Sequence, residues 1–378
     1  MRIGIITTSR ADYGIYRSVL EALRGDDEIS YGLLVSGTHF SRVHGFTVEE
    51  IESDGHPIWA RLPLNLAGDG AFDIATAAAE ASTRFAEAYA ALSNLDLLIA
   101  LGDRYEMFGA VAAAVPFNLP VAHLHGGETT QGAIDDKYRH AITMLADVHF
   151  TATADYRARV VAMTGSEWVY HVGALALDGI EDLELPTTRQ LMDRFGLDFL
   201  QPTVLVTFHP ETVAYGKNTQ HATILVETLT ILSERYQIVL SLPNADTASN
   251  ELRTELTALA DKNPRVYAIE HFGKLNYFAA MREARFLLGN SSSAIIEAPS
   301  LQRYAINLGR RQVGRVRSAN IIDAAVDRLS IFAAVTDIER RGFTYMGDNV
   351  YYKNGRAGEI IVDRLKAFVR SKPLAHVR

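Results

Sequence analysis

Hydrophobic and polar positions follow two alternating patterns along most of the chain. Short apolar runs bounded by polar or glycine-containing loops predict buried strands. Longer segments with apolar residues at helical spacing predict amphipathic helices; within 12–23, one face carries Ile15, Val19, Leu20 and Leu23. Strands that alternate with helices are typical of a parallel sheet covered by helices on both faces. The pattern therefore predicts the α/β class.

The first half of the chain contains one such series. Apolar runs predict strands at 2–7, 31–35, 96–101, 120–124, 147–152 and 169–173. Helical spacing predicts helices at 12–23, 71–92 and 104–115, and a further helix of about ten residues after residue 152. A polar connection with Pro186 and Pro202 occupies about 174–202 and ends this series.

A second series follows the connection. The apolar runs PTVLVTFHP, YQIVLSLPN, RVYAI, ARFLLGNSSS and RYAINLG predict its strands. Helices are expected at 219–235 and 249–262, and a last amphipathic helix at 355–369. Two domains of ordinary α/β size account for the two series, 1–172 and 173–356. The last helix, about 357–378 with a frayed end, is expected to pack back on the first domain.

The composition is that of a globular protein without sulfur chemistry. Of the 378 residues, 48% are hydrophobic, so each domain can build a core. The formal net charge of −8 is mild for this length and argues against a nucleic-acid surface. Because the chain has no cysteine, disulfides, thiolate nucleophiles and sulfur-based zinc sites are excluded.

The apolar runs also bear on location. None reaches the roughly 18 residues of a membrane span, so no membrane partner is expected. The first ten residues, MRIGIITTSR, lack the charged region, long apolar region and cleavage site of a signal peptide. We therefore expect a cytoplasmic protein.

Ionisable residues are concentrated in one crossover, from Leu101 to His140. They are Asp103, Arg104, His123, His125, Glu128, Asp135, Asp136, Arg139 and His140. Carboxyl ends of parallel strands meet at one edge of a sheet, so Asp103 is expected near the group that starts at His125. Burying such charges is costly unless they pair or do chemistry. The alternative is a solvated loop with a helix cap, against which Gly126-Gly127 indicates close backbone approach.

A candidate anion site lies between Arg285 and Pro299. There a buried strand ends in Gly289-Asn290, and three serines open a helix. Free N–H groups and the dipole at a helix N-terminus attract anions, and Ser291 and Ser292 can add hydroxyl donors. Ordinary N-capping by serine is the alternative. Glu297 is expected on the first turns of this helix, where it suits ribose hydroxyls or the helix dipole.

Other candidates also follow strands. His209, in TFHP, is expected to face an inter-domain cleft, although a histidine after a strand is often structural. Arg10 and Arg311 are the natural counter-charges of a diphosphate. Asn244, in LPNAD, ends another strand on the same side. A surface role is the alternative for both arginines.

A divalent metal is the rival use of His123, His125, Glu128 and Asp135. The two histidines are two residues apart, so a strand would point both the same way. No second carboxylate cluster has ligand spacing, so no metal is expected.

Taken together, the motifs resemble the UDP-N-acetylglucosamine 2-epimerases over nearly the whole length, most closely the hydrolysing branch of bacterial sialic-acid-type pathways. The motifs are SRADYG (9–14), GTHF with the nearby His44, GDRYE (102–106), HGGE (125–128), DDKYRH (135–140), FHPET (208–212), PNAD (243–246), GNSSSAIIEAPS (289–300) and GRRQVGR (309–315). Each motif alone is weak, but together they are specific. The GDRYE and DDKYRH motifs favour the hydrolysing branch over the non-hydrolysing epimerases.

The resemblance implies a GT-B-like fold, with two Rossmann-like domains and an active-site cleft between them. It also implies a reaction without a cofactor: a base removes the C2 proton of the sugar while UDP leaves C1, and water adds to the resulting glycal. The products are the 2-epimeric sugar and UDP. The expected partners are therefore a UDP-sugar and UDP, and the family suggests a homodimer or homotetramer.

The resemblance also suggests roles for individual residues. The acid–base candidates are Asp103, Glu128, Asp135 and His209, with Arg104 and Arg139 holding them. The substrate-binding candidates are Arg10, His39, Asn244, Ser291, Ser292, Glu297 and Arg311. One departure matters: many members have H-x-E-G-G-E, and His125 stands where the first glutamate would be. Imidazole can act as base or acid near neutral pH, so His125 or Asp103 is the preferred C2 base.

Two other classes of function fit the same fold. A glycosyltransferase predicts an acceptor groove and has no need of the acids between 103 and 136, and a nucleotide-sugar binding protein tolerates neutral residues there. Within the hydrolysing branch, the sugar is N-acetylglucosamine or 2,4-diacetamido-2,4,6-trideoxyglucose, the latter feeding legionaminic-type sugars. The loops at 37–66, with Phe40, Phe46, Trp59 and Leu64, contact the sugar in one interpretation and the core in the other.

Overall fold

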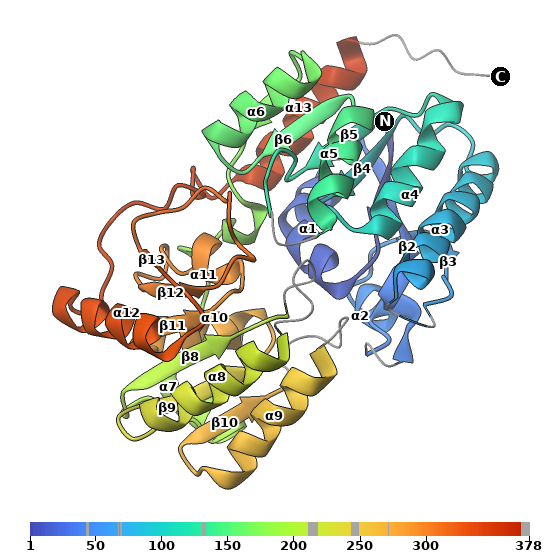
Figure 1. The fold of residues 1–378 in the computed structure, drawn as a ribbon. Helices are drawn as coiled ribbons and strands as arrows, with labels where there is room; N and C mark the ends of the chain where they lie inside the picture. Colours follow the sequence, from blue (N-terminus) through green and yellow to red (C-terminus); the bar gives the residue numbers. More distant parts are fainter. Residues whose placement is uncertain are drawn as a thin grey trace. The chain divides into compact units, whose positions relative to one another are not determined.

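A computed structural model describes residues 1–42, 45–66, 68, 70–130, 134–210, 218–242, 249–270 and 272–371 (Figure 1). Its contacts divide the chain into two compact units. Unit 1 contains Met1–Glu128, Ile134–Asp178 and Tyr351–Arg378, and unit 2 contains Thr129–Ala133 and Gly179–Val350. The predicted domain ranges, 1–172 and 173–356, stay a prediction. No helix of the described ranges is long and apolar enough to cross a membrane.

Unit 1 is built on a parallel sheet. Its strands are β1 (Arg2–Thr7), β2 (Ser30–Ser36), β3 (Ile58–Leu62), β4 (Leu97–Leu101), β5 (Val121–Leu124), β6 (Val148–Thr151) and β7 (Val169–His171). They lie in the order β3-β2-β1-β4-β5-β6-β7. The chain changes direction across the sheet between β1 and β4, and at such a switch point the loops after the two strands diverge and leave a crevice.

Helices cover both faces of this sheet. They are α1 (Arg10–Arg24), α2 (Val48–Ser53), α3 (Ala71–Ala91), α4 (Tyr105–Ala114), α5 (Asp135–Leu145), α6 (Ala154–Thr164) and α13 (Ala357–Ser371), with short 3-10 turns at Gly37–Phe40, Val115–Phe117 and Leu175–Leu177. Strand β1 shows the alternation: Ile3 and Ile5 belong to one core cluster, and Ile6 belongs to the other. Because both faces are covered, its strands read as nearly continuous apolar runs.

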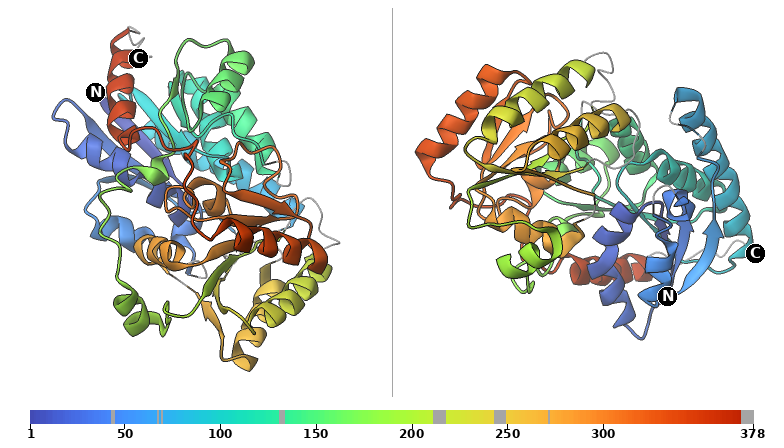
Figure 2. Two further views of the ribbon diagram at one scale, coloured as in Figure 1. Left: turned by 90° about the vertical axis from the view of Figure 1, so that its left-hand side faces the viewer. Right: turned by 90° about the horizontal axis from the view of Figure 1, so that it is seen from below.

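Helix α13 completes the first core, although it comes from the end of the chain. It packs against α1, and both views of Figure 2 show the red helix beside the blue one. The side chains of Ile361, Leu365 and Phe368 are at most 1% exposed. Asp178 accepts hydrogen bonds from the N–H groups of Ala357 and Gly358 at 2.8 and 2.7 Å, which satisfies free donors of the first turn.

Unit 2 repeats the architecture. Its strands are β8 (Thr203–Thr207), β9 (Gln237–Ser241), β10 (Val266–Ile269), β11 (Phe286–Gly289), β12 (Ala305–Leu308) and β13 (Ile321–Ala324), in the parallel order β10-β9-β8-β11-β12-β13. Its helices are α7 (Thr188–Phe195), α8 (Asn218–Leu232), α9 (Ser249–Lys262), α10 (Lys274–Glu283), α11 (Ser293–Ile296) and α12 (Arg328–Arg341). The switch point lies between β8 and β11.

The predicted α/β class and the parallel sheets are confirmed. The sequence pattern missed β3, an edge strand whose residues are mostly half-buried, and α5, whose first turns consist of charged residues. It also missed α7, which lies inside the predicted connection. The helix predicted after the three serines is α11, which has only four residues.

Candidate active site

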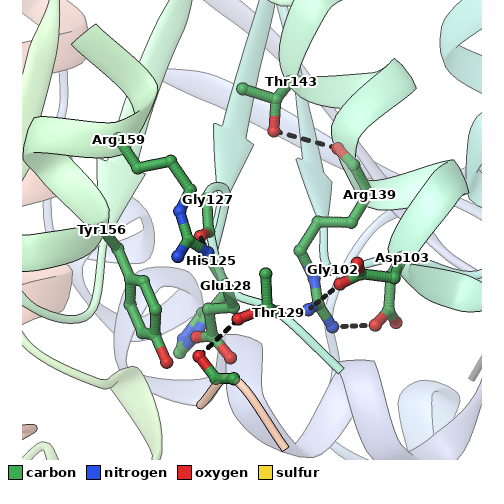
Figure 3. Close-up of polar contacts among 12 residues, drawn as sticks. Gly102, Asp103, His125, Gly127, Glu128, Thr129, Arg139, Thr143, Tyr156 and Arg159 are labelled. Atoms are coloured by element: carbon green, nitrogen blue, oxygen red, sulfur yellow. Dashed lines mark hydrogen bonds and ion pairs between the residues drawn. The ribbon is translucent and has the colours of Figure 1, made fainter. Parts of the chain in front are cut away.

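Strands β4 and β5 bring the ionisable crossover to one edge of the unit 1 sheet. They are paired neighbours, and the N–H of Gly102, the residue after β4, donates to the carbonyl of Leu124, the last residue of β5, at 3.0 Å. Asp103 and His125 therefore follow adjacent strands, as the sequence predicts. Figure 3 shows Asp103 against Arg139 of α5, which forms an ion pair with it. Arg139 is 4% exposed, and its guanidinium also lies 4.0 Å from Asp136.

His123 of β5 contacts both the loop after β4 and helix α5. Its Nε2 lies 2.8 Å from the Gly102 carbonyl, and its Nδ1 lies 3.1 Å from the Thr143 hydroxyl of α5. Since a carbonyl only accepts, Nε2 carries the hydrogen. Burial lowers the pKa of His123 from 6.5 to about 3, so the ring is neutral at physiological pH. The side chain thus links the loop before Asp103 to the helix that carries Arg139.

His125 forms a pair with Glu128. Its Nδ1 lies 2.7 Å from Glu128 Oε1, and Figure 3 shows the two side chains together. His125 has φ +62°, the left-handed region that costs a non-glycine residue roughly 1 kcal/mol or more. Its Nε2 is buried and has no hydrogen-bond partner among the described residues. The pair therefore presents a ring nitrogen with free capacity and holds the other against a carboxylate.

The turn that carries this pair is fixed from behind by helix α6. Gly127 has φ +77°, and a Cβ there would meet the Tyr156 carbonyl at 2.8 Å. Arg159 donates to the Gly127 carbonyl at 2.9 Å. The double glycine thus has the close backbone approach that the sequence predicts, and the approach is to α6. After the turn, Thr129 donates to the Gly314 carbonyl of unit 2 at 2.5 Å.

The remaining unit 1 candidates have diverse surroundings. Arg104 donates twice to Glu106, at 3.1 and 3.0 Å, and Glu106 is 0% exposed. Asp135 begins α5 and is half-buried. His39 is fully buried, and hydroxyls of Thr7 and Thr47 lie 2.9 and 2.8 Å from its ring nitrogens.

His39 and Arg10 have competing partners. Burial lowers the pKa of His39, so it is a neutral member of an internal network, and a substrate contact would require it to exchange a partner. Arg10 is half exposed, and its Nε lies 3.5 Å from Glu50. Such an exposed ion pair is weak, so an anion can compete for the guanidinium.

His209 and Asn290 meet at the switch point of unit 2. The His209 N–H donates to Asn290 Oδ1 at 2.7 Å, and Asn290 Nδ2 donates to the His209 carbonyl at 2.8 Å. Arg311 and Gln312 both donate to the Asn290 carbonyl, at 3.1 and 2.8 Å. Burial and then the charge of Arg311 lower the pKa of His209 to about 3. The structure therefore groups His209, Asn290 and Arg311 at one sheet edge.

The serines of the candidate anion site follow directly. Ser291 Oγ lies 3.0 Å from Ser293 Oγ, and Ser292 is the N-cap of α11 without a side-chain capping bond. Because α11 has four residues, its dipole contributes little, and hydroxyl and N–H donors carry the site. Glu297 is the C-cap residue of this helix, not a residue of its first turns as the sequence predicts.

The remaining residues named from the sequence fall into two groups. Asn244 and His44 lie outside the described residues. Phe40 and Phe46 pack against one core cluster of unit 1, and Trp59 and Leu64 pack against the other. This packing favours the core interpretation of these four side chains.

The four residues of the alternative metal hypothesis do not come together as a set of metal ligands. His123 has both nitrogens occupied by Gly102 and Thr143, whereas His125 lies beyond the end of β5 with a left-handed backbone. The described parts of the chain hold no group of three or more histidine and acidic side chains able to bind a metal.

Sequence reasoning missed several supporting residues. Glu106, Thr143 and Arg159 hold unit 1 residues, and Gln312 and Tyr277 hold the loop of unit 2. The acidic residue in GDRYE and the second polar residue in GRRQ were available signals. Thr143 and Tyr277 have none, because their roles depend on tertiary contacts.

Comparison with known proteins identifies the family. The family model described as UDP-N-acetylglucosamine 2-epimerase matches residues 21–366. The chain is 31% identical over 378 residues to polysialic acid biosynthesis protein P7 of Escherichia coli, covering 98% of this chain and 95% of that protein. It is 34% identical over 326 residues to the hydrolysing UDP-N,N'-diacetylbacillosamine 2-epimerase of Legionella pneumophila subsp. pneumophila, covering 86% and 85%.

Solved structures agree on the fold. The crystal structure of UDP-GlcNAc 2-epimerase from Neisseria meningitidis bound to UDP-GlcNAc matches with a TM-score of 0.80 and 17% identity, covering 97% of this chain and 100% of that one. At this identity the match shows the fold alone, and it confirms the GT-B-like assignment. The family resemblance predicted from the motifs is confirmed as well: this chain belongs to the UDP-N-acetylglucosamine 2-epimerase family.

Proposed function

We propose that the protein is a hydrolysing UDP-N-acetylglucosamine 2-epimerase, which converts UDP-N-acetylglucosamine and water into N-acetylmannosamine and UDP. The observation that carries the proposal is the His125–Glu128 pair, with a ring nitrogen that has no partner among the described residues. Support also comes from the relatives, two of which are named as hydrolysing 2-epimerases. The product would supply a sialic-acid-type nonulosonic acid pathway.

In the first step, His125 Nε2 takes the C2 proton while the C1–O bond to UDP breaks. The electron pair of the C2–H bond forms the C1=C2 double bond, and UDP leaves with the pair of the C1–O bond. The Nδ1 hydrogen of His125 points at Glu128, and this carboxylate stabilises the imidazolium that forms. We therefore assign to Glu128 the role of orienting His125, the proposed base.

In the second step, water adds to the glycal. Its hydroxyl bonds to C1, and a proton returns to C2 on the face that gives the 2-epimer. Asp103 and Asp135 are the candidates that steer this water, and Arg139 holds Asp103 as a fixed negative charge. Arg104 is assigned to the sugar side with them.

The leaving diphosphate needs stabilisation as its charge grows. We assign Ser291, Ser292 and Arg311 to this role, with Arg10 as a further counter-charge, and Glu297 and Asn244 to the nucleoside. His209, which is neutral through burial, is assigned a hydrogen-bonding role at the pyrophosphate side. A UDP-sugar that contacts both sets of residues is a requirement of the proposal.

The alternative sugar has a specific observation in its favour. A relative with 34% identity is named for UDP-N,N'-diacetylbacillosamine, whereas the relative at 31% is named for polysialic acid biosynthesis. A parallel measurement of kcat/KM on the two nucleotide sugars separates these substrates. A glycosyltransferase, the alternative of another class, has no such support.

The proposal is tested by incubating the protein with UDP-N-acetylglucosamine alone and measuring free UDP. A hydrolysing epimerase releases UDP without an acceptor, whereas a transferase gives little and a binding protein gives none. In deuterated water, the released sugar should carry deuterium at C2. Release of UDP without this label would contradict elimination through the glycal.

A further inference from the structure

Four hydroxyl groups form a continuous chain beside the candidate diphosphate site. Thr207, the last residue of β8, lies 3.1 Å from the Tyr277 hydroxyl, measured from its Oγ1. The Tyr277 hydroxyl lies 3.0 Å from Ser293 Oγ, which in turn lies 3.0 Å from Ser291 Oγ. Tyr277 comes from α10, so it joins a strand end to the serine loop.

The hydrogens of this chain can be counted. Each hydroxyl has one hydrogen to donate, so three contacts use three hydrogens and one of the four hydroxyls keeps the fourth. If Thr207 donates to Tyr277 and the direction continues, Ser291 keeps its hydrogen and can donate it outward. If the direction is reversed, the hydrogen remains at Thr207, and Ser291 offers only lone pairs to a ligand.

Local contacts favour the first direction. The Ser293 N–H donates to Ser291 Oγ at 3.4 Å, a contact that both directions allow. Thr207 Oγ1 has no other side-chain or backbone partner among the described residues, so a hydrogen left there would be unused. An anion at Ser291 accepts hydrogen bonds and donates none, which favours the same direction.

We propose that Tyr277 is a positioning residue that directs the Ser291 hydroxyl toward the diphosphate of the substrate. The inference rests on the proposed function, because it assumes that Ser291 binds UDP. Burial raises the pKa of the Tyr277 phenol above its ordinary 10, so the hydroxyl stays a neutral donor at physiological pH. Edge contact with Phe272, at 5.9 Å between ring centroids, holds the ring in place.

The first test is Tyr277→Phe, which removes the hydroxyl and keeps the ring. UDP affinity, measured by titration calorimetry, should fall about three- to tenfold, the usual effect of one hydrogen bond. Tyr236→Phe is the matched control, since its hydroxyl donates to Glu339 at 2.6 Å in the same unit and belongs to no proposed site. UDP affinity of this control should stay at the wild-type value.

The second test separates positioning from general loosening. In a Ser291→Ala background, Tyr277→Phe should have no additional effect on UDP affinity, because the residue that it orients is absent. Affinity for uridine, which lacks the diphosphate, should be the same in wild type and Tyr277→Phe. If Tyr277→Phe fails to fold, Ser293→Ala interrupts the chain between Tyr277 and Ser291 and carries the same expectations.

The outcomes are distinct. The inference is overturned if Tyr277→Phe binds UDP as tightly as the wild type does, or if Tyr277→Phe causes an equal loss of UDP affinity in the Ser291→Ala background. The proposed function still stands in that case, provided that the wild type releases UDP from UDP-N-acetylglucosamine. A wild-type protein that neither binds UDP nor releases it overturns both. A selective loss that vanishes with Ser291→Ala supports the inference.

Discussion

A single backbone torsion determines what His125 can do. Its φ of +62° turns the ring away from the path of β5 and toward Glu128. A left-handed backbone is unfavourable in free energy for a non-glycine residue. Such a conformation persists only where surrounding contacts hold it in place. Here the contacts are those of the Gly127 turn with Arg159 and Tyr156. The strained backbone therefore marks His125 as a candidate functional residue.

We expect His125→Asn to lower the rate of UDP release from UDP-N-acetylglucosamine by at least about a hundredfold, as for loss of a general base. UDP affinity should change by less than about twofold, because the assigned diphosphate residues are untouched. His56→Asn is the control, since this imidazole contacts Arg24 and Tyr31 at a separate place. Near-normal turnover of His125→Asn would remove His125 from the mechanism.

Asp103→Asn should also lower turnover by at least about a hundredfold, with a modest change in UDP affinity. The substitution keeps the shape of the side chain and removes the charge that pairs with Arg139. Steady-state kinetics and calorimetry on one preparation measure both quantities. Activity close to wild type would show that the assigned role of Asp103 is wrong.

At the residue scale, sequence motifs predicted which side chains gather but not how they pair. Asp103, His125 and Glu128 were found from their density after adjacent strands. The pairing of Arg104 with Glu106, and of His123 with Gly102 and Thr143, depends on distances that the sequence does not contain.

At the scale of elements, the backbones of strands β8 and β11 lie very close together at Gly289. Gly289 has φ +142° and pairs with Thr207, and a Cβ on it would lie 1.9 Å from the Thr207 carbonyl. A glycine is therefore required for Asn290 and the serines to follow β11 at this distance from His209. The geometry of the candidate anion site depends on this one missing side chain.

We expect Gly289→Ala to weaken UDP binding by at least about tenfold and to lower the unfolding free energy by more than about 1 kcal/mol, because the strands must separate. Calorimetry and urea unfolding measure the two effects. Gly14→Ala is the control: nothing lies within 4 Å of its added Cβ, and alanine favours a helix. Unchanged UDP affinity in Gly289→Ala would contradict this account of the loop.

Helices and strands could be predicted from the sequence where their residues are mostly buried. Strands such as β1 and β4 are almost wholly buried, so their apolar runs were unmistakable. Strand β3 is half-exposed at the sheet edge, and α5 begins with the charged candidate residues Asp135 and Asp136, so neither has a simple pattern. Helix α11 ends after four residues because a turn follows at Glu297, which the apolar residues Ile295 and Ile296 do not indicate.

For the whole molecule, buried imidazoles connect stability to pH. His149 of β6 is 0% exposed and faces His123 of β5 in the strand register. Neither ring nitrogen of His149 has a partner in the described ranges. Burial lowers the pKa of His149 from 6.5 to about 4. Between these values the unfolded chain binds a proton that the folded chain excludes, so stability falls as pH decreases.

We expect the unfolding free energy of the wild type to decrease between about pH 7.5 and pH 5, with about 2 kcal/mol of the decrease due to His149. His149→Leu should reduce the pH dependence by that amount. Urea unfolding of both proteins at the two pH values measures it. An identical pH dependence in His149→Leu would mean that His149 is protonated without cost in the folded state.

Helix α13 completes the first core of unit 1. Substitutions of its buried residues should therefore lower the unfolding free energy and should not act directly on catalysis. Phe368→Ala should cost roughly 3–5 kcal/mol, since this ring is 1% exposed and packs at 5.2 Å, centroid to centroid, on Trp168. Arg370→Ala, on the exposed side of the helix, should cost less than about 1 kcal/mol. Thermal unfolding measures both. Equal losses in the two variants would contradict the assigned packing of α13.

The peptide bond after Glu128 joins the candidate site of unit 1 to a short segment that is grouped with unit 2. Glu128 belongs to unit 1, whereas Thr129, the next residue, is grouped with unit 2 and bonded to the Gly314 carbonyl of the GRRQVGR segment. Because Thr129 follows Glu128 directly, this hydrogen bond anchors the C-terminal end of the turn that holds Glu128 2.7 Å from His125, and Thr129→Val would remove that anchor.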